Sequence, residues 1–305
     1  MKAAYTEENG GPEKVKVGEL PRPEPGADEL LIRVHAAAVA PSDWQQLAGQ
    51  WSPLTFPHIV GAEAAGVVET APAGSEFRPG DGVWGHVRGS YAEYVTTNGK
   101  ELVPKPESLS FVEAVALVIP GTTALEGIVE KLDLQPHESI LITAAAGGVG
   151  GAAVQIAVSI GARVIGVASA VNHGYVLSLG ATDCFDYHDS GWFDAVRELV
   201  DGGVDTLLDC AGGETGQDAL KALRDGARAS FVASPMPDVS AEGRGITGEM
   251  FSSKSTRKRL EAINQLLKAG KLKAQVTDTE PLDRAREMLE KNQQGHTRGR
   301  VVLKT

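Results

Sequence analysis

The pattern of apolar and polar positions divides the chain into a β-rich part and a part in which strands and helices alternate. Up to about residue 120, short apolar runs, some strictly alternating and some continuous, are typical of strands. The predicted strands are Lys2–Tyr5, Val15–Glu19, Glu29–Ala40, Ala64–Glu69, Gly82–Trp84 and Ala92–Thr96. Turn sequences rich in proline, glycine and asparagine separate them. This part therefore predicts a compact β unit without a parallel sheet.

From Gly121 onward the hydrophobic period alternates between that of a helix and that of a strand. The predicted helices are Thr122–Lys131, Ala152–Ile160, Asn172–Leu179, Trp192–Val200, a segment containing Ala219–Leu223, and Ser255–Ala269. The predicted strands between them are Ile140–Thr143, Arg163–Ala168, Asp183–Asp186, Val204–Asp209 and Arg228–Ala233. Such alternation predicts an α/β fold with a doubly wound parallel sheet.

The last part of the chain, residues 271–305, returns to a strand–helix–strand pattern. Its final apolar strand needs a sheet to join, and the N-terminal β unit is the natural host. We therefore expect residues 1–120 and 271–305 to form one domain, with residues 121–270 inserted as a second.

The stretch Ser139–Ser169 contains the most informative motif, a glycine-rich turn between a strand and a helix. The turn reads Ala-x-Gly-x-x-Gly at Ala145, Gly147 and Gly150. Small residues allow a tight bend, a close approach of the backbone to a pyrophosphate, and close packing of helix on strand. The N–H groups that open the helix attract phosphates. This order of segments favours a Rossmann dinucleotide site over a flexible apolar loop. The backbone groups expected at the phosphates belong to Ala146, Gly147, Gly148 and Val149.

Charge and composition narrow the class of protein further. Ser139–Ala162 has no charged residue over 24 positions, but its clustered glycines and the strand beginning at Arg163 favour a buried βα unit over a membrane helix. A net charge of −11 disfavours nucleic acid and anionic membranes as partners. Cys184 and Cys210 lack the spacing of a disulfide framework, and the N-terminus lacks an apolar signal region. We therefore expect a soluble, cytoplasmic protein.

Seven motifs in order make nearly the whole chain resemble the zinc-independent quinone oxidoreductase (ζ-crystallin-like) branch of the medium-chain dehydrogenase/reductase superfamily. They are Pro41–Asp43, Phe56–Val68, Gly80–Gly85, Tyr91–Tyr94, Gly121–Ala124, Ala144–Gly150 and Gly295–Leu303. The resemblance implies a GroES-like catalytic domain built from both ends of the chain, around an inserted Rossmann domain. It also implies a homodimer, which we expect to form through the Rossmann sheet edge around Arg228–Ala233.

Departures from the zinc-dependent relatives predict that no metal is bound. Those relatives carry a Cys before the Pro-Ser-Asp motif and a His before the Glu of the Gly-x-Glu motif, where this chain has Ala40 and Ala62. Their third ligand lies near the segment that here reads Val118–Pro120, which has no ligating side chain. A zinc alcohol dehydrogenase is therefore disfavoured.

The end of the second Rossmann strand predicts the cofactor. In NAD-selective Rossmann domains an acidic residue there binds the ribose 2′-OH. Here the position is Ser169, which cannot repel a 2′-phosphate and can donate a hydrogen bond to it, and Asn172 and His173 add donors. We therefore expect NADPH, although His173 can also be read as a solvated surface residue.

The resemblance implies further contacts to this cofactor. A Lys often occupies the position of His173 in the family, and a Tyr at the next strand end, here Tyr187, reaches the phosphate. Thr123 matches the position that contacts the nicotinamide ribose. Ala211 and Ser234 follow the next two strands and lie on the edge of the sheet where ligands bind.

The same resemblance implies a substrate cleft whose floor carries Ser42, Asp43 and Trp44. Trp44 and Trp51 are candidates for an apolar wall against a flat substrate, with ordinary packing as the alternative. Asp43 has a second reading as a helix cap, which we favour. Enoyl-thioester reductases of this branch use a Tyr as proton donor where this chain has Trp51. Because indole has no acidic proton to give, solvent becomes the expected proton source. An enoyl-thioester reductase activity is therefore less favoured.

The sequence thus predicts an NADPH-dependent oxidoreductase that transfers a hydride to a quinone or an α,β-unsaturated carbonyl without a metal. The alternative is a non-catalytic NADPH-binding redox sensor or structural protein, because no clear acid, base or metal ligand emerges. Hydride transfer to such acceptors needs only geometry and a dry site from the protein.

Overall fold

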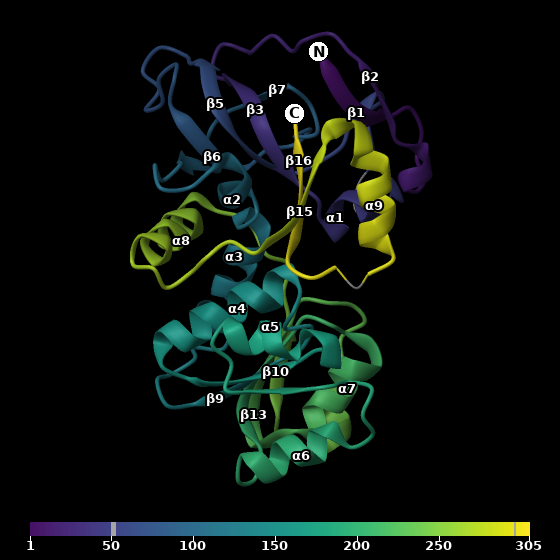
Figure 1. Ribbon diagram of the computed structural model, residues 1–305, viewed down its shortest axis with the longest axis vertical. Coiled ribbons are helices and arrows are strands. Elements are labelled where there is room, and N and C mark those ends of the chain that lie inside the picture. The colour runs from purple at the N-terminus through teal and green to yellow at the C-terminus, as the bar shows by residue number, and fades with distance from the viewer. Residues whose placement is uncertain (50–52, 296) are drawn as a thin grey trace. The chain divides into compact units, whose positions relative to one another are not determined.

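The computed structural model describes residues 1–49, 53–295 and 297–305, which divide into two compact units (Figure 1). The first unit consists of Met1–Ile119, Ser255–Asn264 and Ala274–Thr305. The second consists of Pro120–Lys254 and Gln265–Lys273. Ser255–Asn264, which the sequence pattern grouped with the inserted domain, lies in the first unit.

The first unit is built on two sheets. A seven-stranded sheet runs in the order β15-β16-β3-β5-β6-β8, with β7 paired to β3, and a three-stranded sheet runs β2-β1-β4. The strands of the larger sheet are β3 (Leu30–Ala38), β5 (Glu63–Thr70), β6 (Gly82–His86), β7 (Tyr94–Thr97), β8 (Leu102–Pro104), β15 (Val276–Pro281) and β16 (Arg300–Lys304). Those of the smaller are β1 (Lys2–Thr6), β2 (Lys16–Glu19) and β4 (His58–Ile59). The predicted return of the C-terminal strand to the N-terminal unit is confirmed, because β16 pairs antiparallel with β3 (Figure 1).

Short helices cover the first unit. They are α1 (Pro41–Leu47), α2 (Phe111–Val115), the first residues of α3 (Val118–Leu125), most of α8 (Arg257–Lys268), and α9 (Ala285–Gln293). Leu47 of α1 and Met288 and Leu289 of α9 pack in one buried cluster with Leu303 of β16. This cluster fixes α1, which carries three of the predicted substrate-site residues.

The second unit is a six-stranded, wholly parallel sheet in the order β11-β10-β9-β12-β13-β14. Its strands are β9 (Ser139–Ile142), β10 (Arg163–Val167), β11 (Asp183–Phe185), β12 (Val204–Asp209), β13 (Leu223–Phe231) and β14 (Thr247–Met250). Its helices are α4 (Gly148–Ile160), α5 (His173–Ser178), α6 (Trp192–Leu199) and α7 (Gly213–Lys221). The predicted doubly wound parallel sheet is confirmed.

Alternate residues of each strand meet helices on opposite faces of this sheet. Leu141 of β9 lies in one cluster with Trp192 of α6 and Leu220 of α7. On the other face, a side chain added at Gly166 of β10 would collide with Val176 of α5. Both faces are therefore covered, which explains the continuously apolar strands.

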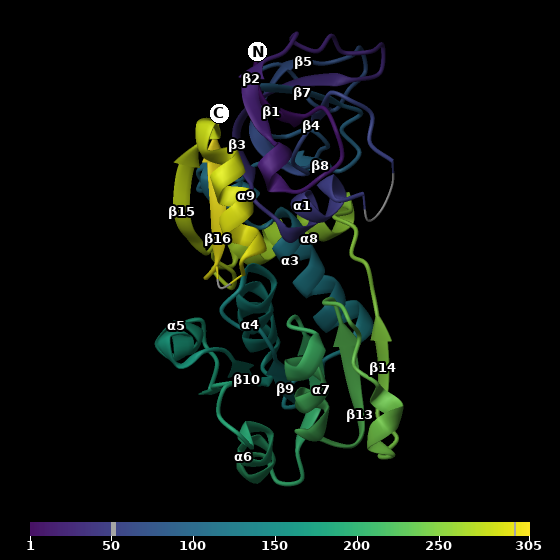
Figure 2. The ribbon, with the colours of Figure 1, turned by 90° about the vertical axis from the view of Figure 1, so that its right-hand side faces the viewer.

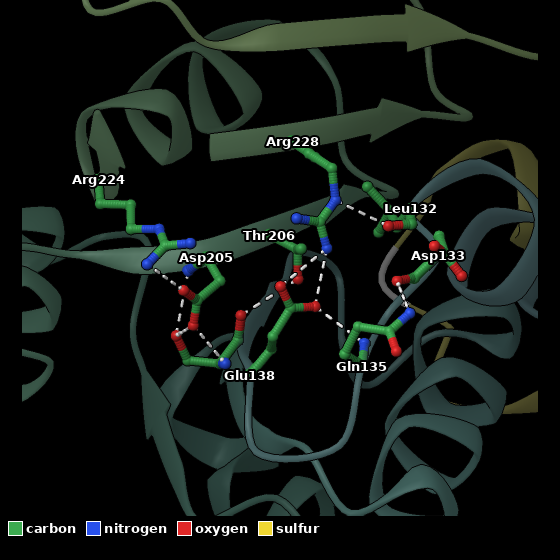
Figure 3. Close-up of polar contacts among 9 residues, drawn as sticks. Leu132, Asp133, Gln135, Glu138, Asp205, Thr206, Arg224 and Arg228 are labelled. Atoms are coloured by element: carbon green, nitrogen blue, oxygen red, sulfur yellow. Dashed lines mark hydrogen bonds and ion pairs between the residues drawn. The ribbon is translucent and has the colours of Figure 1, made fainter. Parts of the chain in front are cut away.

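Polar side chains tie the strands together at the amino ends of β9, β12 and β13 (Figure 3). Arg228 donates to both carboxylate oxygens of Glu138, at 3.0 and 2.7 Å, and to the carbonyl of Leu132. The Asp205 carboxylate accepts from the backbone and hydroxyl of Ser139 and pairs with Arg224 at 2.8 Å. The amino ends of these strands are therefore occupied by structural contacts. The carboxyl ends of the strands, at the opposite side of the sheet, are left for a ligand.

Several predicted element bounds were wrong. The helix predicted at Thr122–Lys131 begins at Val118, and from Glu126 to Lys131 it continues as a π-helix. Pro120 is accommodated because the first N–H groups of a helix have no intrahelical acceptor. The segment Ala219–Leu223 is not wholly helical, since α7 ends at Lys221 and Leu223 already pairs with Val204. The helix predicted at Asn172–Leu179 is His173–Ser178, after a 3-10 turn.

The edge of the sheet was also predicted wrongly. Arg228–Ala233 is not at an edge, because β13 pairs with β12 on one side and with β14 on the other. Figure 2 shows β14 beside β13. The strand β14 contains Thr247, Gly248 and Glu249, whose composition gave no strand signal. The edge strand on this side is β14.

Candidate functional site

The glycine-rich turn leaves the start of α4 without a side-chain cap. α4 begins at Gly148, and its N-cap is Gly147 in an extended conformation (φ −77°, ψ 179°). The first N–H groups of a helix have no intrahelical acceptor, and a glycine cap supplies none. A pyrophosphate would supply the missing acceptors at the positive end of the helix dipole.

Close packing favours glycine at the last position of the motif. A Cβ built on Gly150 would lie 2.3 Å from the carbonyl oxygen of Ala144, whose own φ is +46°. A Cβ on Gly147 would meet only that oxygen, at 3.3 Å. The turn is also tied to β10, because the N–H of Ala145 donates to Val167 at 3.1 Å. This geometry fits a dinucleotide site. Gly150 lets the helix pack closely on the strand, and Gly147 leaves the backbone open to a pyrophosphate.

The residues predicted to select the cofactor lie together after β10. The Asn172 amide donates to the Ser169 hydroxyl at 3.0 Å, and Asn172 N–H donates to the Ser169 carbonyl at 2.8 Å. The His173 ring nitrogen Nε2 lies 3.1 Å from the carbonyl oxygen of Ala168. His173 is thus half-buried and held by the backbone rather than fully solvated.

The loop after β11 contributes a group that the sequence reasoning missed. Asp186 accepts the N–H of Ala170 at 2.8 Å, so it joins this loop to the loop after β10. The same carboxylate accepts the N–H of His188 at 2.9 Å and lies 2.7 Å from that ring's Nδ1. Hydrogen bonds from His188 and Ala170 lower the pKa of Asp186. The predicted residue Tyr187 lies between them in sequence, and its ring is 4.0 Å from that of His188.

The loops after β12 and β13 also meet at the carboxyl edge. The buried Asp209 accepts from Thr143 and from the N–H groups of Ala211 and Gly212. A Cβ on Gly212 would lie 3.1 Å from the Ser234 carbonyl oxygen, so the predicted residues Ala211 and Ser234 stand on adjoining loops. Burial and then Asp209 raise the pKa of the Cys210 thiol in the same turn, which disfavours the reactive thiolate form.

The predicted ribose contact, Thr123, lies in α3 and is 6% exposed. Together with the turn, the Ser169 loop and the Asp209 loop, it belongs to the second unit. The predicted substrate residues belong to the first unit.

In the first unit, Asp43 has the structural role that the sequence reading favoured. It is at the third position of α1, where it accepts the N–H of Ala40 and the hydroxyl of Tyr91, both at 2.8 Å. Burial raises its pKa to about 6, against the hydrogen bonds from Ala40 and Tyr91. Asp43 is therefore a helix cap in the core rather than an exposed ligand-binding group.

The two neighbours of Asp43 in the sequence, Ser42 and Trp44, differ in whether their polar atoms have a hydrogen-bond partner. The Ser42 hydroxyl oxygen is buried and has no hydrogen-bond partner within the described residues. The Trp44 indole N–H donates to Asn292 at 3.1 Å, which assigns this ring to packing against α9. Trp51 lies outside the described residues.

A buried ion pair that the sequence reasoning missed stands beside this cluster. Arg300 donates to the Glu63 carboxylate, whose other oxygen accepts the N–H of Ile119 at 2.8 Å. Burial raises the pKa of Glu63 to about 7, although Arg300 and the Ile119 N–H oppose the shift. The Arg300 guanidinium pairs with Glu63, and its charge also lowers the pKa of the nearby Asp43.

The described residues contain no group of three or more His, Cys, Asp or Glu side chains that could hold a metal ion. Ala40 and Ala62 stand beside Asp43 and Glu63 and have no ligating atoms in their side chains. Within the same described part of the chain, no helix is long and apolar enough to cross a membrane.

Comparison with known families matches both parts of the chain. Residues 26–107 match the alcohol dehydrogenase GroES-like domain, and residues 179–303 match the zinc-binding dehydrogenase family. The quinone oxidoreductase of Mus musculus is 32% identical over 311 residues, covering 97% of this chain and 93% of the mouse protein.

Solved structures share the fold over the whole chain. An NAD-dependent alcohol dehydrogenase has a TM-score of 0.92 and 32% identity, covering 100% of both chains. The quinone oxidoreductase from Coxiella burnetii has a TM-score of 0.90 and 28% identity, covering 100% of this chain and 99% of its own. A mycobacterial protein complexed with NADPH has a TM-score of 0.90 and 25% identity, covering 100% of both chains.

The similarity to the mouse enzyme spans nearly the full length of both proteins, and the GroES-like and parallel-sheet units are both present in the structure. The predicted resemblance is confirmed. The protein belongs to the quinone oxidoreductase (ζ-crystallin-like) family of medium-chain dehydrogenases/reductases, and it is an NAD(P)H-dependent oxidoreductase.

Proposed function

We propose that this protein is an NADPH-dependent reductase that transfers a hydride to quinones or α,β-unsaturated carbonyls without a metal. The observation that carries the cofactor assignment is Ser169, a neutral hydroxyl donor where an NAD-selective site has an acid. The relatives named quinone oxidoreductases support the acceptor class. The mycobacterial neighbour with bound NADPH supports the cofactor, whereas the NAD-dependent neighbour makes cofactor choice the point to test.

The second unit would hold the cofactor by its backbone and by short polar side chains. The uncapped start of α4 would receive the pyrophosphate, and Ser169 with Asn172 would donate to the 2′-phosphate. Thr123 would fix the ribose next to the nicotinamide, and the loops of Ala211 and Ser234 would border it. When bound, the nicotinamide supplies the hydride.

The first unit would contribute orientation rather than a Lewis acid. Ala40 and Ala62 cannot ligate zinc, so a substrate carbonyl would be held by hydrogen bonds, for which the Ser42 hydroxyl is the best candidate. With Asp43 committed to the core and Trp51 without an acidic proton, solvent would protonate the product. Quinones and enones accept a hydride under these conditions.

The test is to mix the protein with NADPH or NADH and a panel of quinones and enones, and to follow the reduced-nicotinamide absorbance. We expect oxidation of NADPH by at least one acceptor, and slower oxidation of NADH. Tight NADPH binding without turnover of any acceptor would instead support the redox-sensor alternative. Faster reaction with NADH would overturn the cofactor assignment.

We also infer a homodimer formed through the second unit. Within the described residues, β14 has a strand partner only on its β13 side, so its outer edge can pair with a second copy. Light scattering should give twice the mass of 32.0 kDa. A Gly248→Pro variant that keeps this doubled mass would exclude the β14 edge.

A further inference from the structure

A continuous polar cluster joins the carboxyl ends of the neighbouring strands β10 and β11. Asn172 donates to Ser169, the next residue Ala170 donates its N–H to Asp186, and Asp186 accepts from His188. Because β10 and β11 are parallel neighbours, their carboxyl ends lie at the same edge of the sheet. This is the edge at which the adenosine ribose of a dinucleotide is expected.

The cluster has an unusual charge for a site that is to hold a 2′-phosphate. The loop segments 168–174 and 186–190 contain no Lys and no Arg, although a phosphate is normally met by such cations. The groups in these segments that can become cationic are the imidazoles of His173 and His188. Within these two segments, recognition of a 2′-phosphate by charge would depend on an imidazole.

We propose that His188, oriented by Asp186, determines the preference for NADPH over NADH by donating a hydrogen bond from Nε2 to the 2′-phosphate. This inference rests on the proposed NADPH-dependent function and assigns its specificity to a residue outside the glycine-rich motif. Both nitrogens of an imidazole carry protons only in its cationic form, so the experiment compares the preference at two pH values.

The orientation of the His188 ring supports this role. Its Nδ1 lies 2.7 Å from the Asp186 carboxylate, and its ring is tilted by 34° against the Tyr187 ring with the centroids 4.0 Å apart. The two nitrogens of an imidazole lie on different sides of the ring, so engagement of Nδ1 directs Nε2 away from the carboxylate. Within the described residues Nε2 makes no hydrogen bond, and 63% of the side chain is exposed. When the ring is protonated, Nε2 is therefore a donor at the surface of the site.

Asp186 does not act as the acid of an NAD-selective site. Its two oxygens already accept from the N–H groups of Ala170 and His188 and from the His188 ring. Three donors thus already occupy this carboxylate. The groups that face His188 are the Asp186 carboxylate and the Tyr187 ring, and the exposed Asp189 follows it in the chain.

His173 is less suited to the same task. Its Nε2 faces the carbonyl oxygen of Ala168, so that nitrogen must keep its proton for the backbone. The ring is only half exposed. We therefore use His173 as the matched neighbour against which His188 is tested.

The experiment is isothermal titration of the full chain with NADPH and NADH, and with adenosine 2′,5′-bisphosphate and adenosine 5′-monophosphate, at about pH 6 and pH 8. The adenosine ligands report on the 2′-phosphate alone, without turnover. The variants are His188→Ala, His188→Lys and the control His173→Ala. Losing one charge-assisted hydrogen bond corresponds to about tenfold in affinity.

For the wild type we expect a preference for the 2′-phosphorylated ligands that is larger at the lower pH. In His188→Ala the preference should fall about tenfold at the lower pH, with binding of NADH and the monophosphate unchanged within about twofold. His188→Lys should keep the preference and remove its pH dependence, and in His173→Ala the preference should fall less than in His188→Ala. A wild-type preference that His188→Ala retains in full would overturn the role of His188 alone. A wild type without any preference at either pH would overturn the NADPH assignment, and with it this inference.

Discussion

Replacing Arg300 by Met should destabilise the first unit in a strongly pH-dependent way. Within the described residues, the Arg300 guanidinium is the cation paired with the buried Glu63, and the two side chains are 7% and 0% exposed. Removing one partner of a buried ion pair costs about 3–5 kcal/mol, because the remaining charge stays buried. Glu63 would keep only the N–H of Ile119.

The sign of the pH dependence follows from the raised pKa of Glu63. That pKa lies at about 7 in the fold against a reference of 4.5, so the folded state holds the proton more tightly than the unfolded state. A raised carboxyl pKa stabilises the fold at low pH, and this contribution is lost as pH rises from about 4.5 to about 7. At 1.36 kcal/mol for each unit, the loss is at most about 3 kcal/mol for Glu63 in the wild type. Asp43, with its pKa raised to about 6, adds a change of the same sign.

In Arg300→Met the pKa of Glu63 rises further, so the loss continues above pH 7. We expect the variant to be destabilised more at pH 8 than at pH 5, by about 1–3 kcal/mol. Urea unfolding at both pH values, followed by circular dichroism and by tryptophan fluorescence, measures the difference. The double variant Arg300→Met with Glu63→Gln is the matched control, because the amide has no charge to bury. Equal destabilisation at pH 5 and pH 8, unchanged when Glu63→Gln is added, would refute this reasoning.

Three further predictions concern the second unit. Gly150→Ala should cost about 1–3 kcal/mol of stability, because its Cβ would lie 2.3 Å from a backbone oxygen. Gly147→Ala should fold normally but bind NADPH more weakly. Melting curves measure the first effect, and titration with NADPH measures the second. Ser169→Asp should weaken NADPH binding by about tenfold or more and spare NADH, and an unchanged NADPH affinity would remove Ser169 from the site. Glu138→Ala should cost about 1–3 kcal/mol, since it leaves Arg228 without its two carboxylate contacts, and a melting temperature equal to that of the wild type would contradict this.

The parts of the fold that the sequence predicted are those fixed by local pattern. The βαβ unit was recognisable because the apolar runs, the glycine turn and the stop at Gly161 lie within about thirty residues, and Gly161 has the left-handed conformation of a helix end (φ +99°). The return of the C-terminal strand was recognisable because Arg300–Lys304 is too apolar to stay exposed. These features need no knowledge of distant contacts.

The features that the sequence did not reveal depend on distant or polar partners. Glu63 and Arg300 are 237 positions apart, and the sequence around each residue does not indicate that its charge is buried. The strand β14 is mostly polar and is defined by its hydrogen bonds to β13 rather than by apolar residues. The bridge between Ala170 and Asp186 likewise arises only when β10 and β11 align. In each case a tertiary contact gives the residue a role that its neighbours in sequence do not indicate.

The most direct test of the central claim is quinone reduction by protein that has been freed of metal with a chelator and analysed for its metal content. We predict that such protein oxidises NADPH with the best quinone of the panel at the same rate as untreated protein, and that added zinc has no effect. Loss of the reaction on metal removal, with recovery on adding zinc, would contradict hydride transfer without a metal. Absence of NADPH oxidation by every quinone before any treatment would contradict the proposed activity itself.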